Sequence, residues 1–129
     1  MVLDTSAILA LLLDEPEAEE FRTALELDDT RIVSAATLLE AAVVIEARKG
    51  DAAGRELDRL IDKAGIAVVS VDADQVEEAR RAWRRFGRGR HEAGLNYGDL
   101  FSYALSRTTG EPLLFKGDDF RRTDVARVI

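Results

Sequence analysis

The amino-acid sequence predicts an α/β domain in which a short parallel sheet of four to five strands is sandwiched between helices. Two observations predict this class. Short aliphatic and β-branched runs alternate with longer segments whose apolar residues recur at helical spacing. Segments that alternate in this way form strand–helix–strand units, whose strands are parallel. The 129 residues, 47% of them hydrophobic, suffice for a core, and we expect a single domain over residues 1–129.

The first third of the chain predicts two strands and two helices. The apolar residues 1–3 form a very short strand, and a helix over about residues 6–13 follows it. Pro16 occupies a place that the first turn of a helix tolerates, so the amphipathic segment 17–26 forms the second helix. The next apolar run, residues 31–35, is the second strand.

The middle of the chain predicts a pair of helices and a third strand. Residues 37–49 keep helical periodicity up to Gly50, and glycine commonly ends helices. Residues 52–63 form another helix with one apolar stripe. The apolar run 65–71 is the third strand.

The last third predicts two helices around a glycine-rich loop. Asp72 or Asp74 caps a helix that ends at Phe86, and the helical spacing of its apolar residues places Trp83 and Phe86 in the core. After the loop, an almost entirely apolar helix begins after Gly98. The remaining strands are residues 113–115 and, as a candidate fifth, residues 126–129.

The charge is acidic overall but unevenly distributed. The net charge of -7 argues against a uniformly basic surface for nucleic acid. Residues 14–29 hold eight acids and one arginine, whereas residues 80–90 hold six arginines and no acid. The acidic total is therefore compatible with a local basic strip that contacts phosphates.

Composition also limits the metal chemistry and the compartment. There is no cysteine and a single histidine, His91, which excludes disulfides and thiolate metal sites. No segment offers the roughly 18 uncharged apolar residues of a membrane helix, and Asp4 interrupts the first apolar run. We therefore expect no membrane association, no export signal and a cytoplasmic location.

Four acidic positions lie at the ends of predicted strands or in apolar helices. Asp4 follows the first strand, and Asp118 follows the fourth, with Asp119 as its rival. Glu40 stands among apolar residues of one helix, and Asp99 opens another. The carboxyl ends of parallel strands share one edge of a sheet, where ligands bind. Asp4, Glu40, Asp99 and Asp118 are therefore candidate catalytic residues.

Each of these acids also has a purely structural interpretation. Asp4 and Asp99 could cap the helices that follow them. Glu40 could complete a capping box with Thr37, although the two preceding alanines extend the helical run and would place Glu40 inside the helix. The acids after the fourth strand could be ordinary turn residues.

Taken together, the acids predict a metal site. Carboxylates gathered in one crevice repel each other unless a cation neutralises them. With oxygen donors and no cysteine, Mg²⁺ or Mn²⁺ fits better than Zn²⁺. Such an ion activates water and stabilises the charge that builds on a phosphodiester during its hydrolysis.

Four segments carry a resemblance to a known family, and together they span nearly the whole chain. They read MVLDTSAILALLLDEPEA, VSAATLLEAAVVIEAR, FGRGRHEAGLNYGDLFSYALSR and EPLLFKGDDFRRTDV. In this order they closely resemble the blocks of PIN-domain ribonucleases, specifically the VapC-type toxins of bacterial toxin–antitoxin pairs. VLDTSA, LNYGDLFSYAL and FKGDDF at this spacing are highly specific as a set.

The resemblance implies roles for individual residues. It implies that Asp4 and Asp99 bind Mg²⁺ or Mn²⁺ directly, and that Glu40 is the family glutamate. Ser6 matches a polar neighbour that often lines the site. The fourth acid is Asp118 or Asp119, of which we prefer Asp118, with Asp124 as a more distant candidate.

The resemblance also implies a function and partners. It implies a PIN-like fold and an endoribonuclease that cuts structured RNA such as tRNA or rRNA through a metal-activated water. It further implies a homodimer that a cognate antitoxin inhibits. None of these partners follows from the composition or the spacing.

Three basic residues are weaker candidates for substrate binding. Arg88 and Arg90 lie in the glycine-rich loop before Asp99, and Lys116 follows the fourth strand. Each could equally be a solvated surface residue. His91 lacks a second histidine or cysteine that would support metal binding, and a surface position is its simplest interpretation.

Two alternative functions use a similar fold. A non-catalytic phosphoacceptor receiver has an acidic pocket and a lysine after a late strand, which Lys116 superficially fits. A receiver needs paired acids after its first strand, however, and here Asp4 is followed by Thr5 and Ser6. The second alternative, an α/β domain that only binds RNA, is not indicated because all four acidic positions are occupied.

Overall fold

Four short parallel strands form one sheet in the order β3-β2-β1-β4. The structure is a computed structural model that describes residues 1–129. The strands are β1 (Val2–Leu3), β2 (Ile32–Ser34), β3 (Ala67–Val69) and β4 (Leu113–Leu114). The helices are α1 (Thr5–Leu12), α2 (Ala18–Leu27), α3 (Ala35–Lys49), α4 (Asp51–Lys63), α5 (Ala73–Phe86) and α6 (Tyr97–Thr109). The predicted α/β sandwich is therefore confirmed.

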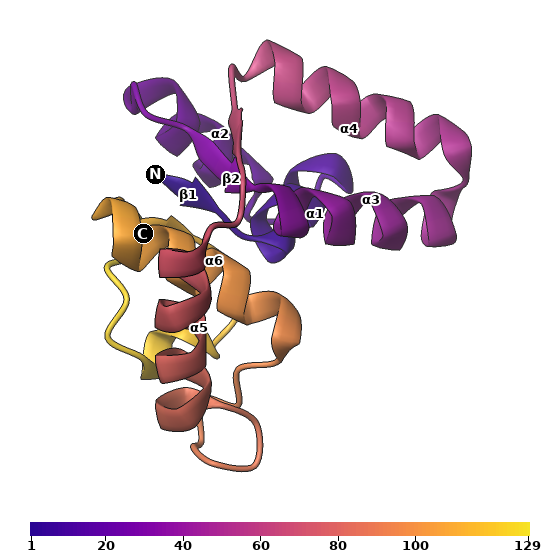
Figure 1. The fold of residues 1–129 in the computed structure, drawn as a ribbon. Helices are drawn as coiled ribbons and strands as arrows, with labels where there is room; N and C mark the ends of the chain where they lie inside the picture. The colour runs from indigo at the N-terminus through magenta and orange to yellow at the C-terminus, as the bar shows by residue number, and fades with distance from the viewer.

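Strands β1, β2 and β4 contribute to both hydrophobic cores, because neighbouring residues of a strand point to opposite faces of the sheet. Val2, Ile32 and Leu113 are in register and pack with α5 and α6. The residues that follow them, on the opposite face, pack with α1 to α4 and are Leu3, Val33 and Leu114. Figure 1 shows α5 and α6 side by side on one side of the molecule and α3 and α4 paired on the other.

The predicted fifth strand does not form. Residues 126–129 run beside β4, but Arg127 makes only an isolated bridge to Leu113. Leu113 donates to the Ala126 carbonyl at 2.8 Å, and Val128 donates to the Leu113 carbonyl at 3.1 Å. The segment is therefore attached to the edge of the sheet at a single residue and does not extend it.

Two helices begin earlier than the sequence predicts, and in both cases a polar residue one position upstream is the cap. Ser34 accepts a hydrogen bond from the Ala36 amide, so α3 starts at Ala35. The alternative capping box at Thr37 does not form, and Glu40 lies inside the helix, as the two preceding alanines indicate. Asn96 caps α6, which starts at Tyr97, before Gly98. At the start of α5, the cap is Asp72, which accepts from the Gln75 amide at 2.9 Å.

The prediction that Trp83 is a core residue is wrong. Trp83 is 43% exposed, whereas Phe86 is buried as predicted. The buried face of α5 against α6 consists of Gln75, Ala82 and Phe86, which lie beside the Trp83 position. Ala82 has a small side chain, which lets α5 and α6 approach closely at this face. The indole of Trp83 lies at the edge of the contact between the two helices.

No helix of the structure has both the length and the apolar composition needed to cross a membrane.

Candidate active site

The sheet order creates a natural site between β1 and β4. From β1 the chain adds β2 and then β3 on one side, and it later returns to add β4 on the other side of β1. In open parallel sheets, ligands bind outside the carboxyl ends of the strands at the point where the order reverses. Asp4 directly follows β1, and residues 116–119 follow β4. The acids at two predicted strand ends therefore meet at one edge.

Asp4 is buried and has hydrogen bonds to both carboxylate oxygens. It is the N-cap of α1, because Oδ2 accepts from the Ser6 amide at 3.0 Å and from the Ser6 hydroxyl at 2.7 Å. Oδ1 accepts from the Ser102 hydroxyl at 2.6 Å. The capping interpretation of Asp4 is therefore correct and leaves its place in the site unchanged, since the cap holds the carboxylate at the sheet edge.

Glu40 lies inside α3 and faces the first turn of α6. Its Oε1 accepts a hydrogen bond from the Thr5 hydroxyl at the start of α1. On the other side, a Cβ added to Gly98 would collide with the Glu40 carboxylate. Glycine at position 98 is therefore what lets the carboxylate of one helix lie against the backbone of the other.

Asp99 is the third residue of α6 and belongs to a capping box. Its Oδ2 accepts from the Asn96 amide at 2.9 Å, and its own amide donates to Asn96 Oδ1 at 3.0 Å. Burial raises the pKa of Asp99 to about 7, the Asn96 hydrogen bond opposes this rise, and the negative charges of Asp4, Asp119 and Glu40 add to it. Asp99 therefore lies within electrostatic reach of the other candidate acids.

The structure brings Asp119, and not Asp118, into this group. The Asp118 side chain is 81% exposed and its Oδ1 lies 3.9 Å from Arg121 Nε. Asp119 is the residue of the pair whose charge acts on Asp99. Both residues are exposed and follow a turn at Gly117, which has φ of +104°. Asp119, the alternative that the sequence also offers, is therefore the better candidate for the fourth acid, and the choice between Asp118 and Asp119 stays a prediction.

The acid cluster, defined as Asp4, Glu40, Asp99 and Asp119, has the chemistry of a site for a hard divalent cation. All its donors are carboxylate oxygens, and burial, with the neighbouring negative charges as a smaller cause, raises the pKa of Asp99. No group of three or more His, Cys, Asp or Glu side chains is placed so that it could hold a metal ion. An open arrangement suits Mg²⁺, which binds one or two carboxylates directly and keeps several of its waters.

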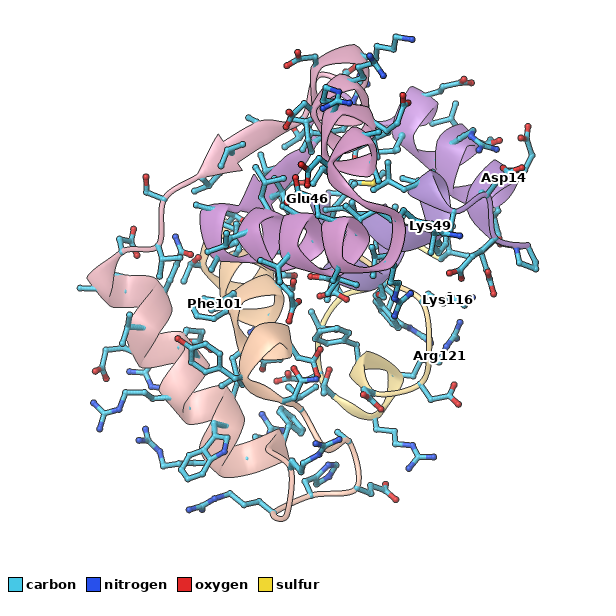
Figure 2. The ribbon with its side chains drawn as sticks, turned by 90° about the vertical axis from the view of Figure 1, so that its right-hand side faces the viewer. Asp14, Glu46, Lys49, Phe101, Lys116 and Arg121 are labelled. Carbon is cyan, nitrogen blue, oxygen red and sulfur yellow. The ribbon has the colours of Figure 1, made fainter.

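Lys116 does not point into the acid cluster. Its Nζ pairs with Glu15 and, at 3.2 Å, with Glu17, and hydrogen bonds to both raise the pKa of Lys116. Figure 2 shows Lys116 on the same side of the molecule as Asp14, which precedes these acids. Its backbone amide donates to the Ser6 hydroxyl at 2.9 Å, so its main chain and not its ammonium group supports the site.

The loop that carries Arg88 and Arg90 is fixed next to α6. Arg88 donates its amide to the Leu95 carbonyl at 3.0 Å, and the Leu95 amide bonds the Phe86 carbonyl at 3.0 Å. Arg90 lies over the Trp83 ring at 4.1 Å. Neither arginine forms an ion pair, which leaves both guanidinium groups available to a phosphate.

The largest groove lies beside the acid cluster and not over it. It has a volume of about 680 Å³ and runs between α5 and α6. Apolar and aromatic side chains dominate its lining, including Val76, Trp83, Tyr97 and Phe101. Asn96 and Tyr97, at the start of α6, connect this groove to Asp99.

Three hydroxyl residues of the site were missed by the sequence analysis. Thr5 binds Glu40, Ser102 binds Asp4, and Thr37 lies 3.2 Å from the Ser102 hydroxyl. A sequence signal existed, because Ser102 stands three residues after Asp99 and Thr37 three residues before Glu40. Residues three apart share one face of a helix.

Comparison with known proteins agrees with this fold. A family profile described as the PIN domain matches residues 1–126. Ribonuclease VapC of Mycolicibacterium smegmatis is 58% identical over 128 residues, which cover 99% of each chain. Ribonuclease VapC30 of Mycobacterium tuberculosis is 56% identical over 128 residues, which cover 99% of this chain and 98% of the relative.

Solved structures give the same fold at much lower sequence identity. VapC20 of Mycobacterium tuberculosis, described as a sarcin-ricin loop cleaving toxin, has a TM-score of 0.77 at 20% identity and covers 97% of this chain and 95% of its own. VapBC2 of Rickettsia felis, bound to a promoter DNA fragment, has a TM-score of 0.79 at 15% identity, with 98% and 94% covered. The PIN-domain profile spans almost the whole sequence, and named VapC ribonucleases are more than half identical to it over nearly their full length. The chain therefore belongs to the PIN-domain family and, within it, to the VapC-type ribonucleases.

Proposed function

We propose that this ribonuclease is a Mg²⁺- or Mn²⁺-dependent endonuclease that hydrolyses phosphodiester bonds of RNA at the acid cluster. One observation carries the proposal. Asp4, Glu40 and Asp119 are close enough to Asp99 for their charges to raise its pKa, and the four come from separate places in the chain. Folding thus brings together four mutually repelling carboxylates, an arrangement that a bound cation stabilises.

The four residues of the acid cluster have two different roles in this proposal, metal binding and proton transfer. Asp4 and Asp99 hold the cation, because both are fixed by hydrogen bonds at the sheet edge. A divalent cation held there would activate a water and neutralise the charge that builds on the phosphodiester. Glu40 and Asp119 complete the cluster, and one of these two carboxylates would accept the proton of the attacking water.

The substrate we propose is structured RNA, such as tRNA or rRNA, in the cytoplasm. The relatives that are more than half identical are named ribonucleases, which supports RNA as the substrate class. Arg88 and Arg90 lie in the fixed loop before Asp99 and offer unpaired cationic groups to the backbone. Ser6 keeps Asp4 in place and, together with Asp4, lines the floor of the site.

The chain acts as the toxin of a VapBC pair, and we propose that a cognate antitoxin protein inhibits it. A solved structure with the same fold supports this: it is described as a toxin–antitoxin complex from Klebsiella pneumoniae and has a TM-score of 0.67 at 18% identity. Inducible expression of the wild type should slow bacterial growth more than expression of Asp99→Asn. Equal growth of the two cultures would contradict the toxin role.

We also propose a homodimer that covers the apolar face between α3, α5 and α6. Tyr97 is 78% exposed, and Leu39, Val43 and Val76 are also exposed. In Figure 2, Phe101 lies in the region between α3 and α5 on the side that faces the viewer. An exposed face of this apolar and aromatic composition is typical of a protein interface.

Cleavage of RNA in defined metal conditions tests the proposed activity. Purified wild-type chain is incubated with total RNA in Mg²⁺, in Mn²⁺ or in EDTA, beside Asp4→Asn and Asp99→Asn. We expect cleavage with either metal and loss of cleavage in EDTA or in either variant. Cleavage that persists in EDTA would exclude the metal mechanism. Asp58→Asn, on the far helix α4, is the matched control and should cleave like the wild type.

The two alternative functions are not favoured by any contact in the structure. A phosphoacceptor receiver needs its lysine at the acidic pocket, and Lys116 is paired with Glu15 and Glu17 instead. A domain that only binds RNA has no need for a cluster of four acids, which repels phosphate.

A further inference from the structure

Two buried hydroxyl side chains, not used by the mechanism above, form a hydrogen-bonded path to Asp4. Ser102 Oγ lies 2.6 Å from Asp4 Oδ1 and 3.2 Å from Thr37 Oγ1. Ser102 is 0% exposed and Thr37 is 1% exposed. The two hydroxyls come from α6 and α3, so these hydrogen bonds join both helices to Asp4, the residue that directly follows β1.

The direction of these hydrogen bonds follows from the number of protons. A serine hydroxyl has a single proton to donate, and a carboxylate oxygen only accepts. Ser102 therefore donates to Asp4 Oδ1 and must accept from the Thr37 hydroxyl. The bond to Asp4 is charge-assisted, and the donor behind it polarises it further.

The same counting identifies the free position on Asp4. A carboxylate offers about four lone-pair sites, two on each oxygen. Oδ2 accepts from both the amide and the hydroxyl of Ser6, whereas Oδ1 accepts from Ser102 alone. The open site is therefore on Oδ1, the oxygen that Ser102 holds.

Ser102 differs from the other serine and threonines of α6. Thr108 and Thr109, which are exposed, donate to carbonyls of their own helix, as helical hydroxyls commonly do. Ser106, one turn after Ser102, donates to the Glu111 carbonyl at 2.6 Å. Among these four, Ser102 alone binds a carboxylate.

We propose that Ser102 is a positioning residue for the metal site. Its hydroxyl, oriented by Thr37, fixes the rotation of the Asp4 carboxylate so that Oδ1 keeps one lone pair for the cation. The inference rests on the proposed function, since it takes Asp4 as a metal ligand. Outer partners that orient ligands in this way commonly change metal affinity by about 10–100-fold when they are removed.

The test measures Mn²⁺ binding directly, by the loss of the electron paramagnetic resonance signal of free Mn²⁺, in the absence of RNA. Ser102→Ala should weaken binding by about 10-fold. Ser106→Ala, which removes a buried hydroxyl from the same helix, is the matched control and should bind like the wild type. Thr37→Val should weaken binding to a smaller degree, and Thr37→Ser, which keeps the donor, should restore it.

A second readout separates positioning from a purely structural role. In RNA cleavage, Ser102→Ala should need about 10-fold more Mg²⁺ for half-maximal rate but approach the wild-type rate at saturation. Thermal unfolding in EDTA checks that the variants are folded, and Thr37→Val carries the test if Ser102→Ala is not.

The outcomes distinguish this inference from the proposed function. Equal Mn²⁺ affinity of Ser102→Ala and Ser106→Ala, or a rate deficit that saturating Mg²⁺ does not relieve, overturns the positioning role alone. If the wild type itself binds no Mn²⁺, the metal site and the positioning role are both overturned.

Discussion

Asp99 combines two roles that the sequence presents as alternatives. It caps α6 through Asn96, and it stands within reach of three other acids. Partial burial raises its pKa from an ordinary value of 3.8 to about 7, with the neighbouring charges as a further cause. Without metal, this carboxylate therefore holds its proton to a much higher pH than an ordinary aspartate does.

The raised pKa of Asp99 predicts how stability depends on pH. Between 3.8 and about 7 the folded chain holds a proton that the unfolded chain has released, so this contribution to stability is lost as pH rises through the window. In EDTA, the unfolding free energy of the wild type should therefore fall, relative to that of Asp99→Asn, as pH rises through this window. Urea unfolding at several pH values measures it, and a difference that does not change with pH would contradict the assignment.

Metal should reverse this trend, because a cation favours the charged carboxylate. We expect Mg²⁺ to raise the melting temperature of the wild type more above pH 7 than near pH 5. Asp99→Asn should show little response to Mg²⁺ at either pH. An equal Mg²⁺ response in that variant would remove Asp99 from the ligands.

Asp118 and Asp119 form a natural pair of matched variants. Asp119→Asn removes a charge that acts on Asp99, whereas Asp118→Asn removes one that is exposed and paired with Arg121. We expect Asp119→Asn to lower the RNA cleavage rate by about 100-fold, as loss of a proton acceptor commonly does, and Asp118→Asn to leave it unchanged. The reverse order would restore our first assignment from the sequence.

Among the elements, α6 contributes most to the site. Its first turn carries Gly98 and Asp99, and its next turn carries Ser102 toward Asp4. The position of α6 relative to α3 depends on the missing side chain at Gly98, because Glu40 occupies that space. A small change at this contact therefore affects two acids at once.

Gly98→Ala should destabilise the fold by about 1–3 kcal/mol, since the added methyl group overpacks a contact that Thr5 helps to hold. Gly54→Ala is the matched control. Its Cβ would also meet a glutamate, Glu46, which lies between α3 and α4 (Figure 2), but Glu46 is exposed, so its carboxylate can turn toward solvent. There we expect a gain of about 0.5–1 kcal/mol from helix propensity. Thermal unfolding of both variants measures these changes in stability. Equal changes in the two variants would mean that the Glu40 side chain also moves aside without cost.

For the whole molecule, the exposed apolar face predicts the oligomeric state. Tyr97→Arg places a charge in the proposed interface and should convert the dimer to a monomer in sedimentation equilibrium. Leu27→Arg, at an 83% exposed position of α2, is the control and should leave the mass unchanged. A monomeric wild type would contradict the proposed dimer.

The sequence predicts the parts of this molecule that depend on local pattern. Alternation of strands and helices yields the parallel sheet, and the strand-end and helix positions yield Asp4, Glu40 and Asp99. The parts that depend on tertiary packing were beyond it. The direction of Asp119, the pairing of Lys116 with the loop after α1, and the exposure of Trp83 are set by how α5, α6 and the β4 turn pack.

The placement of β4 beside β1 has a consequence for synthesis. Asp4 and Glu40 leave the ribosome early, but Asp99, β4 and Asp119 follow only in the last third of the sequence. A nascent chain therefore carries Asp4 and Glu40 before β4 is present to complete the edge of the sheet beside β1. The four acids can therefore meet only after the last third of the chain has been made, so this edge of the sheet is completed late in synthesis.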